Sequence, residues 1–162
     1  MELRRAEAGD AEAIRSIYNA EVLGTTVTFD LVARSPEEQQ AWMAAHDGAY
    51  PVVVAVDDDG VVLGFVALSP YRPRPAYSTT VEDSIYVAAG QRGKGVGRAL
   101  LGEAVRLAQA HGFHSIMARI VGDHEASIAL HRSCGFELVG VEREVGRKFG
   151  RWLDVALMQR LL

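Results

Sequence analysis

The sequence is poor in the features that mark secreted and membrane proteins. Its 162 residues include a single cysteine, Cys134, so no internal disulfide can form and a disulfide-stapled scaffold is excluded. No apolar run approaches the length of about 20 residues that crosses a bilayer. Residues 1–5 lead into no apolar signal core. We therefore expect a cytoplasmic protein with no membrane partner.

Basic charge and metal-ligand patterns are also scarce. The chain has 17 Lys and Arg against 21 Asp and Glu, a net charge of −4, so it has no basic footprint for nucleic acid. None of its five histidines stands at metal-ligand spacing from carboxylates, and we predict no metal. Apolar residues make up 49% of the sequence, as in ordinary globular proteins. The length predicts one domain, residues 1–162, with a sizeable core.

Apolar periodicity predicts an alternation of strands and helices. In chain order we expect a strand at 2–6, a helix bearing Ile14, Tyr18 and Val22, a helix capped by Ser35, strands at 51–56, 61–68 and 76–87, a helix at 96–111, a strand at 115–121, a helix at 125–133, and strands at 136–145 and 152–161. Residues 25–29 are polar and β-branched and predict a loop. This order predicts an α/β fold, a mixed sheet covered by helices.

The most informative segment is Gln-Arg-Gly-Lys-Gly-Val-Gly, residues 91–97, between a strand and a long helix. Glycines at alternate positions let the backbone approach a ligand with no Cβ in the way. The first turn of the helix adds free N–H groups and the positive end of its dipole. Together these features predict a phosphate site.

Two known phosphate loops do not fit this segment. A nucleoside triphosphate loop needs four residues between its first glycine and Gly-Lys, whereas Gly90 and Gly93 are separated by two, and Gly95 follows the lysine. A dinucleotide fingerprint needs Gly-x-Gly-x-x-Gly near the start of a βαβ unit. What remains is Arg92-x-x-Gly95-x-Gly97, or a glycine-rich turn without a binding role.

This remaining motif resembles the coenzyme A pyrophosphate loop of the GNAT N-acetyltransferase superfamily. Residues 72–87, 126–136 and 145–154 are similar to the branch that acetylates phosphinothricin and methionine sulfoximine. The similarity runs in consistent order over nearly the whole chain. It implies the GNAT acyltransferase fold, a central mixed β-sheet flanked by helices, with acetyl-CoA as co-substrate and a homodimer as the assembly.

The resemblance assigns two catalytic residues, Glu82 and His131. Acetyl transfer needs an amine without its extra proton, and a carboxylate can remove that proton if burial raises its pKa. Strand alternation places Glu82, Ser84 and Tyr86 on one face, and the resemblance makes Glu82 the general base. His131 stands where many members have a tyrosine that protonates the leaving thiolate. An imidazole suits this exchange near neutrality, and the alternative is that His131 only orients other groups.

The expected cofactor contacts lie at the end of this strand and in the loop. The backbone N–H of Val87 is expected to face the thioester carbonyl or the pantetheine arm, where negative charge develops. His124 stands where many relatives have an asparagine that contacts the cofactor. The complete expected set is Ile85, Tyr86, Val87, Arg92, Gly93, Lys94, Gly95, Val96, Gly97 and His124.

Arginines before the Glu82 strand point to the acceptor. Guanidinium forks suit carboxylate, phosphinate and sulfoximine oxygens. In the resembled family the pocket comprises the residues matching Val27, Phe29, Arg72, Arg74, Tyr77 and Glu82. The implied acceptor is phosphinothricin, methionine sulfoximine or methionine sulfone, which links the family to antibiotic or herbicide resistance. The alternatives are another amine, such as a polyamine or a protein N-terminus, or a non-catalytic acyl-CoA sensor.

Two further segments carry open alternatives. Cys134 follows His131 by three residues, and a Cys–His pair could form an acyl-enzyme, whereas a packed helix residue is the simpler interpretation. The segment Lys148 to Asp154 serves either the pocket or a subunit interface. Trp152 is large enough to anchor a dimer contact.

Overall fold

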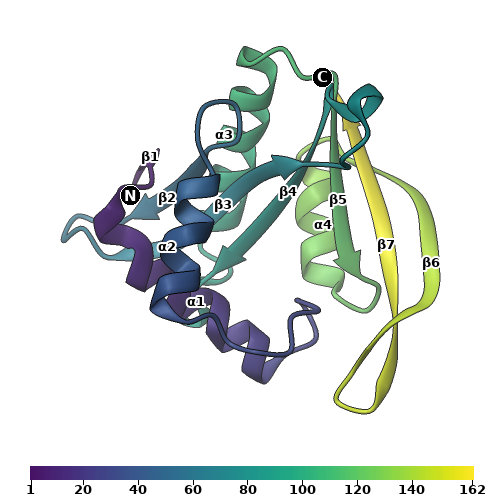
Figure 1. Ribbon diagram of the computed structural model, residues 1–162, viewed down its shortest axis with the longest axis horizontal. Helices are drawn as coiled ribbons and strands as arrows, with labels where there is room; N and C mark the ends of the chain where they lie inside the picture. Colours follow the sequence, from purple (N-terminus) through teal and green to yellow (C-terminus); the bar gives the residue numbers. More distant parts are fainter.

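The computed structural model describes all 162 residues as one seven-stranded sheet with helices on both faces (Figure 1). The strands are β1 (Glu2–Arg5), β2 (Val52–Val56), β3 (Val62–Pro70), β4 (Thr80–Val87), β5 (Ser115–Val121), β6 (Glu137–Lys148) and β7 (Arg151–Leu161). The helices are α1 (Ala11–Gly24), α2 (Pro36–Ala45), α3 (Val96–Ala110) and α4 (Glu125–Ser133). The predicted order of elements and the mixed α/β sheet are confirmed.

The sheet opens between its two central strands. Its order is β1-β2-β3-β4-β5-β7-β6, and only the β4–β5 pair is parallel. That pair is short, running from Thr80 opposite Ser115 to Glu82 opposite Met117. Beyond Glu82 the two strands diverge, β4 remaining paired with β3 and β5 with β7 (Figure 1). The divergence leaves a gap in the middle of the sheet.

The two faces of the sheet have separate cores. Helices α1 and α2 cover one face, where Tyr18 and Phe65 are buried, and α3 and α4 cover the other, where Leu100 and Phe136 are buried (Figure 1). Along β4 the side chains alternate between them. Val81 belongs to the α3 side and Tyr86 packs on the α1 side, as the alternation predicts.

Several local signals are confirmed at the residue level. Ser35 accepts the N–H of Glu38 at 3.1 Å, and the Glu38 carboxylate accepts the N–H of Ser35 at 2.7 Å, a complete capping box. Phe149 and Gly150, with φ of 50° and 73°, form the two-residue turn between β6 and β7. None of the helices combines the length and apolar composition that a membrane span requires.

Two strand boundaries differ clearly from the prediction, the start of β4 and the end of β6. The strand expected over residues 76–87 begins at Thr80, because residues 75–77 form a 3-10 turn. Pro75 starts this turn, and the N–H of Tyr77 donates to the carbonyl of Arg74 at 3.0 Å. These groups are therefore bonded locally and are not available to a neighbouring strand. At the other end of the chain, β6 continues to Lys148, beyond the expected 145.

Candidate active site

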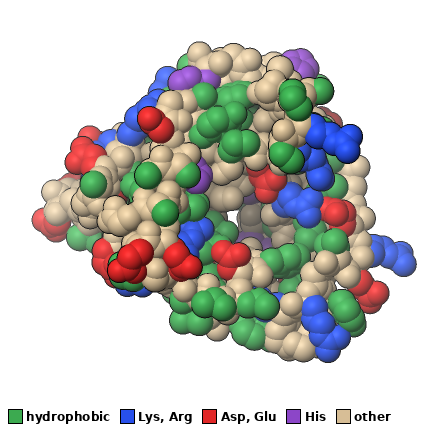
Figure 2. Space-filling model, in the orientation of Figure 1, with side chains coloured by type: hydrophobic (Ala, Val, Ile, Leu, Met, Phe, Trp, Pro, Cys, Tyr) green, Lys and Arg blue, Asp and Glu red, His purple; other side chains and the backbone are tan.

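The gap between β4 and β5 opens into a cavity of about 430 Å³. Figure 2 shows the surface hollowed near its centre, with acidic and basic side chains on the rim. Of the predicted site residues, those that line it are Val27, Glu82, Ile85, Tyr86, Val87, Arg92, Gly93, Gly95, Gly97, His124 and His131. The others, Phe29, Arg72, Arg74, Tyr77, Lys94 and Val96, lie outside its lining.

The backbone of β4 offers hydrogen-bonding groups to this gap. The N–H of Ala88 donates to the carbonyl of Leu63 in β3 at 2.9 Å. Since N–H groups alternate in direction along an antiparallel strand, those of Val87 and Ile85 turn away from β3. They point to the side where β5 has diverged. The Val87 carbonyl, which points the same way, accepts a hydrogen bond from Arg92 at 3.4 Å.

The glycine loop meets the same cavity at the start of α3. Gly93 and Gly95 have φ of 77° and 86°, in the left-handed region that side chains disfavour. A Cβ at either position would meet nothing within 4 Å, so their backbone faces open space. Gly97 differs, because its Cβ would lie 3.1 Å from the Leu130 side chain. Gly97 therefore lets α3 approach α4, while Gly93 and Gly95 leave open backbone at the start of α3, the kind of surface that could hold a phosphate group.

Charged residues of this loop behave differently from one another. Arg92 forms an ion pair with Glu21 of α1, a buried carboxylate that also accepts from the Thr25 hydroxyl at 3.0 Å. The Lys94 ammonium turns to Gln91, 3.1 Å away. Val96 is 3% exposed and packs in the core beneath α3. Sequence reasoning missed Glu21, because nothing in its local pattern indicates the loop 71 residues away.

Glu82 is a half-buried carboxylate on the α1 side of β4. Burial raises its pKa above the ordinary value, and the neighbouring charge of Asp83 adds to this effect. The cations Arg119 and Arg72 oppose it without reversing it. Arg119, which lines the cavity from β5, is itself paired with Glu142 at 2.7 Å. A carboxylate with a raised pKa is suited to accept a proton from an ammonium group.

His131 belongs to α4, which covers the opposite face of β4, and its side chain is 1% exposed. Its Nδ1 is 2.8 Å from the Ser127 carbonyl, and its Nε2 is 3.1 Å from Oδ2 of Asp83. The Phe136 ring packs edge-on against it at 5.1 Å. Burial alone would lower the pKa of His131, but the hydrogen bond and charge of Asp83, with the Ser127 carbonyl, raise it overall. Asp83 was not predicted, although alternation placed it opposite Glu82.

Two other residues of this helix have distinct environments. His124, half-buried at the start of α4, lines the cavity, and burial and the nearby Arg92 charge lower its pKa. A neutral imidazole there can donate or accept a hydrogen bond, as the expected asparagine replacement requires. Cys134 does not line the cavity, and its Sγ lies 3.9 Å from the Ser133 hydroxyl.

Of the expected acceptor residues, only Val27 and Glu82 line the cavity. Val27 reaches the cavity, while Phe29, 41% exposed, packs on Gly146 of β6. Arg72 lies in the exposed turn before β4, with its guanidinium over the Tyr71 ring at 5.0 Å. Its charge acts on Glu82 through space. Arg74 and Tyr77 are exposed in the same turn.

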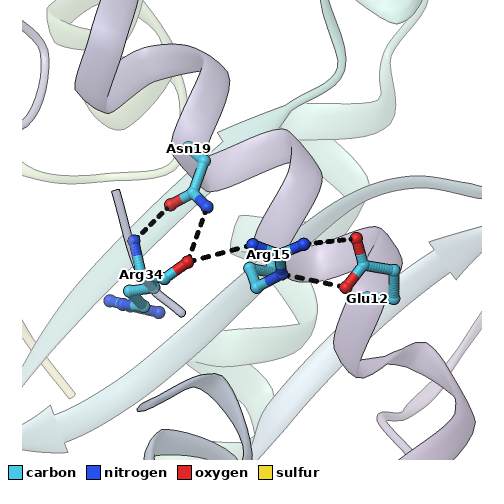
Figure 3. A network of polar contacts seen from close by, with 4 residues as sticks. All are labelled: Glu12, Arg15, Asn19 and Arg34. Atoms are coloured by element: carbon cyan, nitrogen blue, oxygen red, sulfur yellow. Dashed lines mark hydrogen bonds and ion pairs between the residues drawn. The ribbon is translucent and has the colours of Figure 1, made fainter. Parts of the chain in front are cut away.

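The loop between α1 and α2, residues 25–35, is fastened at both ends. The Arg34 carbonyl accepts from Arg15 and from Asn19, both at 3.0 Å, and the Arg34 N–H donates to Asn19 at 2.8 Å (Figure 3). At the other end, the buried ammonium of Lys148 donates to the Thr28 carbonyl at 2.8 Å. Burial lowers the pKa of Lys148. Lys148 thus supports the loop that carries Val27.

Comparisons with known proteins agree with this geometry. Residues 3–157 match the family model described as the acetyltransferase (GNAT) domain. The chain is 41% identical to a phosphinothricin N-acetyltransferase of Streptomyces coelicolor, covering 100% of this chain and 96% of the relative. It is 42% identical to an L-methionine sulfoximine/L-methionine sulfone acetyltransferase of Pseudomonas paraeruginosa, covering 97% and 92%.

A solved structure extends the agreement to three dimensions. The phosphinothricin acetyltransferase of Sinorhizobium meliloti, in complex with acetyl-CoA, is 46% identical and superposes with a TM-score of 0.96, covering 99% of this chain and 88% of that one. The resemblance drawn from the motifs is therefore confirmed. With its divergent central strands, its glycine loop and these relatives over nearly its whole length, the chain belongs to the GNAT acetyltransferase family.

Proposed function

We propose that this chain transfers the acetyl group of acetyl-CoA to the amino group of phosphinothricin, methionine sulfoximine, methionine sulfone or a similar small amino acid. The observation that carries the proposal is the placement of Glu82, a half-buried carboxylate with a raised pKa in the wall of the β4–β5 cavity. The acceptors named for the relatives support the amino acid class.

The proposed reaction is a direct attack with no covalent enzyme intermediate. Acetyl-CoA, when bound, supplies the acetyl group as a thioester. Glu82 removes a proton from the acceptor ammonium, so that the amine can form its bond to the acetyl carbon as the carbon–sulfur bond breaks. The N–H of Val87 offers a donor to the carbonyl oxygen, where charge develops. Gly93 and Gly95, with Arg92 and His124, would hold the cofactor from the loop and α4.

The acceptor would enter from the side of the α1–α2 loop. Val27 supplies an apolar contact in the cavity wall. Phe29 and Tyr77, 41% and 40% exposed, would supply aromatic surface to the acceptor. Arg72, whose charge acts on Glu82, would bind the acceptor's carboxylate or its phosphinate or sulfoximine head, with Arg74 beside it. A bidentate guanidinium contact would orient the amine towards Glu82.

We also infer a homodimer built on the β6–β7 side of the sheet. Leu138, Val141 and Trp152 are 51%, 50% and 58% exposed there, an unusual density of apolar side chains on an edge. Their burial against a second copy would remove this surface from water. Sedimentation velocity measures the assembly directly, and a monomer at micromolar concentrations would contradict the inference.

An acceptor screen tests the proposed activity. Free thiol release from acetyl-CoA is measured with phosphinothricin, methionine sulfoximine and methionine sulfone, and in parallel with polyamines and peptides bearing free N-termini. We expect release with the first group only. Release with a polyamine or peptide alone would replace the acceptor class. Acetyl-CoA binding without release on any amine would instead indicate a non-catalytic sensor.

A further inference from the structure

A buried ionisable pair, Asp83 and His131, lies on the α3 side of β4. The proposed attack on the thioester gives no role to Asp83. Asp83 is 6% exposed and His131 is 1% exposed, and the two side chains meet at 3.1 Å. Both residues nevertheless contribute to the cavity wall. The pair therefore borders the site of reaction while being shielded from bulk water.

The hydrogen bonds fix where the protons are. A carbonyl oxygen can only accept, so the contact of Nδ1 with the Ser127 carbonyl at 2.8 Å requires a hydrogen on Nδ1. The contact of Nε2 with Oδ2 of Asp83 then requires one further shared proton. That proton resides either on the ring, opposite a carboxylate, or on the carboxyl group, opposite a neutral ring. In both forms the pair is electrically neutral and holds one proton that it can release.

The second oxygen of Asp83 adds an independent observation. Oδ1 is buried and has no hydrogen-bond partner in the chain. An unpartnered carboxylate oxygen in a protein interior is costly, and evolution of a purely structural pair would favour satisfying it. Asp83 itself lines the cavity that the reacting groups would occupy, so its side chain is both incompletely bonded and close to the proposed reaction.

The other charged groups around the pair do not substitute for Asp83. On β4, Glu82 lies on the opposite face, and on β5 Arg119 is paired with Glu142. His124, just before α4, and Arg98 of α3 also line the cavity wall. Cys134, at the end of α4, lies outside the cavity lining. Asp83 is the charged side chain in direct contact with the His131 ring.

We propose that Asp83 is a positioning residue for His131, fixing the ring through Nε2 and keeping the shared proton on the pair, so that the pair can protonate the departing coenzyme A thiolate. This inference rests on the proposed acetyl transfer. As the carbon–sulfur bond breaks, the sulfur keeps the bonding electrons and receives the proton of the pair. The pair is left as a neutral imidazole and a carboxylate, and it regains a proton from solvent before the next turnover.

The substitution Asp83→Asn tests the proposal, because an amide preserves the shape of the side chain and removes its charge. Nuclear magnetic resonance titration of histidine-labelled protein follows His131 in the wild type and in the variant, with the exposed His111 and His114 as internal references. We expect the wild-type ring to stay protonated to a higher pH than in the variant. This readout needs no acceptor, so it is independent of the acceptor screen.

Kinetics of the same two proteins complete the test. We expect kcat to fall about 10- to 100-fold in Asp83→Asn, less than the full effect of a general acid, with the KM for acetyl-CoA changed less than about twofold. Because the acid must be protonated, kcat falls as pH rises through its pKa, and in the variant this fall should begin at lower pH. An unchanged kcat and pH profile would overturn the positioning role.

The wild-type titration alone also decides the matter if the variant does not fold. A His131 ring that is neutral at pH 7 beside an ionised Asp83 would mean that the pair holds no releasable proton, and would overturn the proposal. A His131 titration that supports the pair, combined with no acceptor in the screen, would instead reject the proposed acetyl transfer and leave the proton-holding pair intact.

Discussion

Glu82 and Asp83 are consecutive carboxylates of one strand, yet they occupy opposite environments. Glu82 faces the α1 side, half-buried, where only burial and nearby charges act on its pKa. Asp83 faces the α3 side, 6% exposed, and is bonded to the ring of His131. The difference teaches that the environment of a carboxylate, and not its residue type, decides which role can be proposed for it: Glu82 as a proton acceptor, and Asp83 as the partner that keeps a proton on His131.

The gap in the sheet brings both residues to one cavity. In a continuous sheet, side chains on opposite faces are separated by the backbone layer. Here β4 and β5 are paired only as far as Glu82 and Met117, and both carboxylates border the same cavity. In the proposed reaction, Glu82 would take the proton of the acceptor amine from one face of β4, and the Asp83–His131 pair would protonate the leaving sulfur from the other.

The largest expected effect comes from removing the base. Glu82→Gln keeps the shape of the side chain and should lower kcat by about 10²- to 10⁴-fold, the usual contribution of a general base. Acetyl-CoA binding, measured by calorimetry, should change little. If His131 titrates in this variant as in the wild type, the effect of Glu82 is separate from that of the Asp83–His131 pair.

The pH profile gives the sign of this effect. Burial raises the pKa of Glu82 above its ordinary value of 4.5, and the base works only when ionised. In the wild type kcat/KM should therefore fall as pH drops through this raised pKa. In Glu82→Gln that limb should be absent, and the residual rate should rise with pH as more of the acceptor amine loses its proton. Parallel profiles for the two proteins would remove Glu82 from the mechanism.

A smaller effect is expected from a substitution in the glycine loop. Its proposed role, acetyl-CoA binding, is needed whether Glu82 or Asp83 is being tested. Gly95 has φ of 86°, and a β-branched residue there is strained by about 1–2 kcal/mol or more. Gly95→Val should raise the Kd for acetyl-CoA by about tenfold or more. Gly90→Ala is a matched control in the same loop, because its Cβ would meet nothing within 4 Å and its φ is not positive. Equal losses in the two variants would contradict a specific role for Gly95.

The smallest effect is expected from Gly146→Ala, and it should change acceptor binding on the Glu82 face of β4 only. At Gly146 a Cβ would lie 2.2 Å from the Phe29 ring, so Gly146→Ala must displace that ring from the loop that carries Val27. Loss of an aromatic contact worth about 0.5–1.5 kcal/mol should raise the acceptor KM about 2- to 10-fold. Acetyl-CoA affinity should stay the same.

Gly140→Ala is the matched control on the same strand, because a Cβ there would meet nothing within 4 Å. It should leave the acceptor KM unchanged. The His131 titration should also be unchanged in Gly146→Ala. A shifted titration would show that the loop over Glu82 affects the Asp83–His131 pair, and would contradict the independence of the two faces of β4.

Local patterns in the sequence were sufficient for much of the fold. Apolar periodicity predicted the order of helices and strands, and capping residues placed the start of α2, because these signals depend on neighbours within a few positions. The start of β4 was wrong where the turn at Pro75 used its backbone groups locally. The sequence left two roles open for Lys148, in the pocket or in a subunit interface. In the structure its ammonium is buried and bonded to the α1–α2 loop.

The sequence by itself determined the family, the alternation that separates Glu82 from Asp83, and the position of the glycine loop at the start of α3. Only the tertiary structure decided where the sheet opens, that Asp83 bonds His131, 48 residues away, and that Lys148 holds Thr28 across 120 residues. The physical reason is the separation in sequence between the residues that interact. Helix periods, caps and turns are set by adjacent residues, whereas the partner of a buried charge depends on which distant strand or helix the whole fold brings against it.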